Sequence, residues 1–165
     1  MRVLPCIHRP AIVLLASAAA VAVPATLVSG CRAGTATTVT VHGANGPVEV
    51  RVELAHTRET QARGLMWREK LGRGAGMLFV FARERERAFW MKNTPVPLDI
   101  IYIDSNGGVV SVAENTTPYS TAPIPSRAPA RYVLEVNAGF ASTHGVGPGS
   151  RVDIPELPAA PPAGS

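Results

Sequence analysis

The chain has 165 residues, 46% of them hydrophobic and 17% charged, a length and composition that fit one ordinary folded domain. Sixteen basic residues against twelve acidic ones give a net charge of +4, but the basic residues are scattered and do not alternate with aromatic ones, which argues against a nucleic-acid partner. Two cysteines are too few for a small fold that is held together by several disulfides.

The first thirty residues have the parts of an export signal. Arg2 and Arg9 give a positive start, residues 11–23 form an uncharged apolar run, and small residues follow before position 31. Two other interpretations of this segment stay open. The uncharged stretch is long enough to cross a bilayer as a permanent helix, and a cut near Ala25 would make the segment an ordinary signal peptide.

Residues 27–31 read Leu-Val-Ser-Gly-Cys and resemble the lipobox of bacterial lipoproteins, in which the final cysteine receives the lipid. We favour this interpretation because Cys31 ends the apolar run where the lipobox requires it. The resemblance implies a lipoprotein signal peptide over residues 1–30, and a diacylglycerol and a fatty acid such as palmitate on Cys31. Two or three acyl chains would hold the protein on a membrane that faces the periplasm or the exterior. Arg32 replaces the Asp that commonly retains such proteins at the inner membrane, which favours the outer membrane in a bacterium with two membranes.

The remaining chain divides into a tether at residues 31–37, a folded domain at 38–154 and a disordered Pro/Ala tail at 155–165. Thr57 is placed to cap a short helix that runs to about Met66, and Gly145 is placed to end a second one over 138–144. The prediction is a single-domain, mainly β fold, a β-sandwich or a partly closed barrel with two short helices, because the strands follow one another too closely for helical crossovers. Apolar segments bounded by turn residues predict these strands at 38–42, 48–54, 77–81, 88–91, 98–104, 109–114, 132–136 and 151–154.

Several blocks within the domain carry a family resemblance. They are residues 63–66 (RGLM), 76–81 (GMLFVF), 89–100 (FWMKNTPVPLDI), 133–139 (VLEVNAG) and 147–152 (GPGSRV). In this order they resemble the family named domain of unknown function 192, over roughly residues 48–154. The resemblance implies a compact, mainly β domain but supplies no activity. One departure is Ser150, where the family usually has an Asp after the glycine.

Residues 90–99 concentrate polar side chains beside bulky apolar ones. One interpretation is a cleft in which Trp90 forms an apolar floor, while Lys92, Asn93 and Asp99 point at a small polar ligand. The other is a structural corner in which Asp99 pairs with Lys92 or Arg63 and fixes the fold.

Glu135 lies inside an apolar strand segment, so the sequence predicts that it is either on the solvent face or paired. Arg63 is the predicted partner, and loss of a buried pair in Glu135→Ala would lower the denaturant midpoint. Asp99 and Glu135 could also act as the acid and base of a hydrolase, provided that both open into one pocket.

Other chemistry finds little support in the sequence. Residues 72–76 are rich in glycine but lack the lysine of a phosphate-binding loop, so no nucleotide or other cofactor is predicted. No metal site is predicted either, because the histidines lack the spacing of zinc ligands. Three methionines, which could bind copper, lie in core-like runs: Met66, Met77 and Met91.

The sequence therefore predicts a membrane-tethered lipoprotein of the cell envelope that acts as a non-catalytic binding or accessory domain for a small polar ligand or an envelope partner. The alternative is a hydrolase of envelope glycans or esters that uses Asp99 and Glu135, so the question of catalysis stays open. A purely structural envelope protein is the third candidate. The residues predicted to line the ligand site are Arg63, Trp90, Lys92, Asn93, Asp99 and Glu135.

Overall fold

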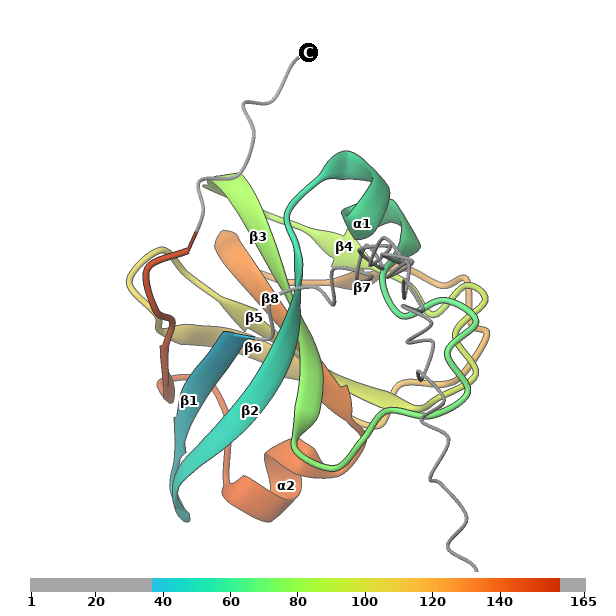
Figure 1. Ribbon diagram of the computed structural model, residues 1–165. Coiled ribbons are helices and arrows are strands. Elements are labelled where there is room, and N and C mark those ends of the chain that lie inside the picture. Colours follow the sequence, from blue (N-terminus) through green and yellow to red (C-terminus); the bar gives the residue numbers. More distant parts are fainter. Residues whose placement is uncertain (1–36, 158–165) are drawn as a thin grey trace, which may run out of the picture. The chain divides into compact units, whose positions relative to one another are not determined.

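The computed structural model describes residues 37–157, and Figure 1 shows their arrangement. The predicted signal peptide, the lipidation site at Cys31, the tether up to residue 36 and the tail from residue 158 lie outside the described residues. Within residues 37–157, no helix combines the length and the apolar character that crossing a bilayer requires.

Seven strands form one curled sheet in the order β6-β5-β8-β3-β2-β1-β9 (Figure 1). Neighbouring strands are antiparallel except for β2 and β3, which run parallel. The bounds of the seven strands are β1 (Thr37–Gly43), β2 (Gly46–Ala55), β3 (Ala75–Arg85), β5 (Leu98–Ile103), β6 (Val109–Ala113), β8 (Ala130–Asn137) and β9 (Arg151–Asp153).

The two edges of this sheet meet at one end. The amide of Val109, at the start of β6, donates to the carbonyl of Ser150 at 2.8 Å, and a bridge links Gly108 to Arg151. The Ser150 hydroxyl accepts from the Gly147 amide at 3.1 Å, so serine still supports the turn at the position where the family usually has Asp. The sheet is therefore a partly closed barrel, which confirms the predicted mainly β fold class.

The sheet buries apolar side chains on both faces. All six residues of β5 are buried, because side chains alternate between the two faces and each face has a core of its own. On the inner face, Ile101, Leu134 and Val136 pack with residues from all the remaining strands of the sheet. The outer face carries a second cluster that includes Ile100 and Val133.

Loops and two small elements cover the outer face. Helix α1 (Arg58–Arg63) begins at Thr57, whose side chain and that of Thr60 cap each other's backbone amides, as the sequence predicts for its start. The helix ends earlier than predicted, because Gly64 adopts φ 48° and ψ −135°, which is not helical. The second of these elements is a two-stranded sheet that pairs β4 (Ala88–Phe89) with β7 (Ile124–Pro125).

The second helix, α2 (Phe140–His144), packs against the inner core through Ala141 and ends at Gly145 as predicted.

Candidate functional site

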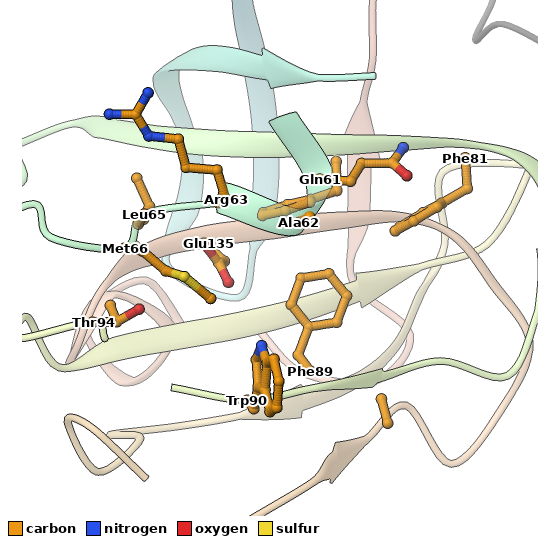
Figure 2. Close-up of a pocket in the computed structure, with 13 residues that line it drawn as sticks. Gln61, Ala62, Arg63, Leu65, Met66, Phe81, Phe89, Trp90, Thr94 and Glu135 are labelled. Atoms are coloured by element: carbon orange, nitrogen blue, oxygen red, sulfur yellow. The ribbon is translucent and has the colours of Figure 1, made fainter. Parts of the chain in front are cut away.

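A pocket of about 270 Å³ lies on the outer face of the sheet (Figure 2). Its lining comes from several separate parts of the chain. Helix α1 and the loop after it supply residues 61–66, β3 supplies Phe79 and Phe81, and β4 with the next residue supplies positions 88–90. Thr94 and Glu135 complete the lining.

Glu135 supplies a carboxyl group to the base of this pocket. In the register of the sheet it lies opposite Met77 of β3 and Ile100 of β5, so its strand neighbours on this face are apolar. Only 5% of the residue is exposed, and Figure 2 shows its carboxyl between the side chains of Met66 and Phe89. Among residues 37–157, no hydrogen bond or ion pair reaches this carboxyl. Burial without a partner raises the pKa of Glu135 to about 8, because water no longer stabilises its charged form.

Aromatic rings form one wall of the pocket. Phe89 contacts Phe79 and Phe81 edge to face, with ring centroids 4.9 and 6.5 Å apart. The guanidinium of Arg87 lies 3.4 Å from the centre of the Phe81 ring, and its Nε donates to the carbonyl of Ala130 at 2.8 Å. Burial lowers the pKa of Arg87 to about 10, so the group stays charged at neutral pH. These contacts hold the wall in place against β8.

The opposite wall is tied to the edge of β3. The side-chain amide of Gln61 donates to the carbonyl of Val80 at 2.8 Å, beyond the point where β2 stops pairing with β3. Gly64 packs against Phe79 so closely that a Cβ at this position would lie 3.2 Å from the ring, and its positive φ favours glycine as well. These two contacts fix the position of α1 against β3, on the face of the sheet that carries Glu135.

The structure brings only part of the predicted site together. Arg63, Trp90 and Glu135 line the pocket, whereas Lys92, Asn93 and Asp99 do not. The predicted ion pair between Arg63 and Glu135 does not form, because Arg63 is exposed and extends away from the carboxyl (Figure 2).

Asp99 lies on the other face of the sheet. It is opposite Val136 in the register, while its neighbour Ile100 is opposite Glu135, and consecutive side chains of a strand point to opposite faces. Its fully buried carboxyl accepts hydrogen bonds from the amides of Asn115 and Ala141, both at 2.8 Å. The two carboxyls therefore do not share a pocket, which removes the geometry that the hydrolase alternative requires.

Lys92 and Asn93 support the rim of the pocket from outside. The Lys92 ammonium lies 5.1 Å from the centre of the Trp90 ring. Asn93 adopts a left-handed backbone conformation, with φ 56°, and its carbonyl accepts from the amide of Trp67 at 2.7 Å. This bond ties the loop after α1 to the segment after β4. The predicted pairing of Asp99 with Lys92 or Arg63 does not form, because the Asp99 carboxyl accepts from two backbone amides on the other face of the sheet.

Most of the apolar lining of the pocket is absent from the site predicted from the sequence. Phe79 and Phe81 lie on one face of β3, at the spacing of two that alternation requires, and Glu135 is on the same face of β8. Because the run 76–81 is apolar throughout, its sequence predicts a strand but does not show which of its side chains face a pocket. An acid on a strand face shared with two phenylalanines was the available signal.

Comparisons with known proteins agree on the fold. The family model for domain of unknown function 192 (DUF192), described as "Uncharacterized ACR", matches residues 37–154. The structure of a protein of unknown function from Novosphingobium aromaticivorans DSM 12444 is similar, with 41% identity and a TM-score of 0.70, and the match covers 72% of this chain and 85% of that one.

A second similar structure, of a putative transcription regulator from Sinorhizobium meliloti 1021, has 42% identity and a TM-score of 0.68, with 70% and 91% of the two chains covered. No curated protein gives a significant match. Since the family model spans the whole folded domain, from β1 to just past β9, the chain belongs to the domain of unknown function 192 family.

Proposed function

We propose that this domain is a non-catalytic binding module whose small ligand occupies the pocket above Glu135. The observation that carries the proposal is a nearly buried carboxyl that faces a cavity and has no bonding partner among the described residues. Buried polar groups in proteins are almost always hydrogen-bonded, because leaving one unpaired costs about 1–3 kcal/mol. A ligand group that enters the pocket would supply the missing partner.

The size and lining of the pocket support a small molecule. Its volume of about 270 Å³ is close to the lower end of the range for ligand pockets, and its lining combines aromatic and aliphatic side chains with few polar ones. A polymer chain would need a longer groove.

The lining also favours binding over catalysis. Nucleophilic catalysis needs a nucleophile within reach of a base, and glycoside hydrolysis needs two carboxyls. Among the residues that the structure describes, the lining contains one carboxyl, that of Glu135, and the hydroxyl of Thr94 donates to the carbonyl of Lys92 at 3.3 Å. Arg63 is the other ionisable group in the lining and stays exposed at the mouth.

Blocking the pocket tests the proposal. Ala62 is exposed on α1 and lines the pocket, so Ala62→Phe would place a ring over its mouth without disturbing the core. Small soluble fragments, screened by NMR chemical-shift mapping, are expected to shift the amides of Gly64, Met66 and Glu135. Their affinity should fall at least about tenfold in Ala62→Phe.

The control is Arg58→Phe, which places the same ring on the same helix outside the pocket lining. It should bind the fragments as the wild type does. Fragments that map to another surface, or that bind Ala62→Phe undiminished, would contradict the proposal.

We also propose that lipid on Cys31 tethers the domain to a membrane of the cell envelope, with the outer membrane favoured. The support is the lipobox-like sequence at 27–31 after an uncharged apolar run. Mass spectrometry of the mature protein is expected to show a chain that begins at Cys31 and carries two or three acyl groups, and Cys31→Ser should be released from membranes. An N-terminus at Met1, or an unmodified thiol at Cys31, would contradict the tether.

A further inference from the structure

We infer that the pocket takes a compact organic cation, an ammonium group on a small apolar body, with the ammonium against the carboxyl of Glu135. This inference rests on the proposed binding function and names the class of its ligand. The structure supports it in three steps, which concern the donors near Glu135, the aromatic wall and the charge at the mouth.

The polar donors near Glu135 are already engaged elsewhere. The hydroxyl of Tyr102, which lies on the same face of β5, donates to the carbonyl of Ile124 at 2.6 Å. The side-chain amide of Gln61 donates to the backbone carbonyl of Val80, and the hydroxyl of Thr94 donates to the backbone carbonyl of Lys92. None of these three donors reaches the carboxyl, and the Arg63 side chain extends away from it (Figure 2).

The aromatic wall favours a positive partner over a neutral or a negative one. Ring faces carry negative electrostatic potential and attract cations, most strongly where water is excluded. Two rings of the pocket lining already attract cations of the protein itself: the guanidinium of Arg87 lies over Phe81, and the ammonium of Lys92 lies near Trp90. At the base of the pocket an anion would meet these rings and the Glu135 carboxyl, whereas the cation of the lining, Arg63, lies out at the mouth.

The mouth of the pocket limits the charge of the ligand. Arg63 is exposed at the rim, and Lys92 stands beside Trp90, which is itself 47% exposed. A second positive charge, on the part of the ligand that reaches the mouth, would be repelled by these two cations. The fitting ligand has one ammonium group, and the part that faces the mouth is neutral or acidic.

Three probes with one branched hydrocarbon body test the charge preference. They are 3,3-dimethylbutylammonium, the neutral 3,3-dimethylbutan-1-ol and the anion 3,3-dimethylbutanoate. In NMR titrations at pH 8, the ammonium is expected to bind the pocket at least about tenfold more tightly than the alcohol, and the anion least. Glu135→Gln should abolish the preference for the ammonium, while Glu49→Gln, which removes an exposed carboxyl on β2, should keep it.

The pH dependence gives a second readout. Met77 and Ile100 face Glu135 from the adjoining strands, Tyr102 is the titratable group beside it, and Arg63 is the charged group at the mouth. Burial raises the pKa of Glu135 to about 8, so binding a cation at lower pH must expel a proton. Affinity for the ammonium should rise by up to about tenfold per pH unit from pH 6 toward pH 8 and then level off. The amine itself stays charged, since aliphatic amines titrate near 10.

The outcomes separate the ligand class from the binding function. If the alcohol or the anion binds the pocket as tightly as the ammonium, the cation inference is wrong and the binding function stands. If none of the three probes shifts the pocket amides, and the fragment screen also finds no ligand there, both proposals fail.

Discussion

Glu135→Gln is expected to stabilise the domain at pH 8 to 9 and to leave its stability nearly unchanged at pH 5. The unfolded carboxyl titrates near 4.5, whereas burial raises the pKa of Glu135 in the folded state to about 8. Between these values the folded state keeps a proton that the unfolded state releases, so the free energy of unfolding falls as pH rises. The loss amounts to about 1.4 kcal/mol per pH unit and reaches at most about 5 kcal/mol. Glutamine cannot ionise and removes this loss.

Urea unfolding of both proteins from pH 5 to pH 9 measures the effect. The two midpoints should lie close together at pH 5 and diverge progressively above it, with the variant the more stable. Glu49→Gln, an exposed substitution, should follow the wild type at every pH. If wild type and Glu135→Gln keep a constant difference over the whole range, the carboxyl of Glu135 is not desolvated in the folded domain.

The sequence alone predicts Glu135 either on the solvent face or paired with Arg63, because both residues lie among apolar neighbours; a buried ion pair would mean a lower denaturant midpoint for Glu135→Ala. The structure shows neither placement, since Glu135 is 5% exposed and forms no ion pair among the described residues. Composition along the chain does not report where a long side chain extends once α1 has packed on β3. The helix directs Arg63 to the solvent, and the carboxyl faces the pocket alone.

The fold could be predicted from the sequence better than the site could, because local sequence patterns determine most of the fold. The apolar run of β5, the cap at Thr57 and the stop at Gly145 all depend on residues close in sequence. Strand β7 has only two residues, includes a proline, and exists through its pairing with β4. Such an element has no local signal, and neither does the parallel pairing of β2 with β3.

The face on which each acid lies decided whether the predicted site could form. Asp99 and Glu135 both occur in strongly apolar strands, and either could have faced either side of the sheet. A shift of β5 against β8 by one residue would bring Asp99 to the face on which Glu135 lies. The observed register places Val136 opposite Asp99, and only three-dimensional pairing reveals it.

Asp99→Ala is expected to destabilise the domain by about 3–5 kcal/mol, without weakening fragment binding at the pocket. The carboxyl of Asp99 is fully buried and accepts from two backbone amides, one at Asn115 after β6 and one at Ala141 in the first turn of α2. Alanine leaves both donors buried without an acceptor, so α2 and the chain after β6 lose their common anchor. Asp99→Asn keeps only one acceptor oxygen, so its free energy of unfolding should lie between those of the wild type and Asp99→Ala.

Urea unfolding measures the stability change, and NMR titration of the folded variants measures fragment binding. Asp153→Ala is the matched control, because this carboxyl is exposed and bonds to the side chains of His42 and Arg151, so its loss should shift the midpoint little. The opposite pattern, a midpoint near that of the wild type together with lost fragment binding, would place Asp99 in the ligand site. The register of β5 against β8 argues for the first pattern, since a side chain opposite Val136 faces the inner core, away from the pocket.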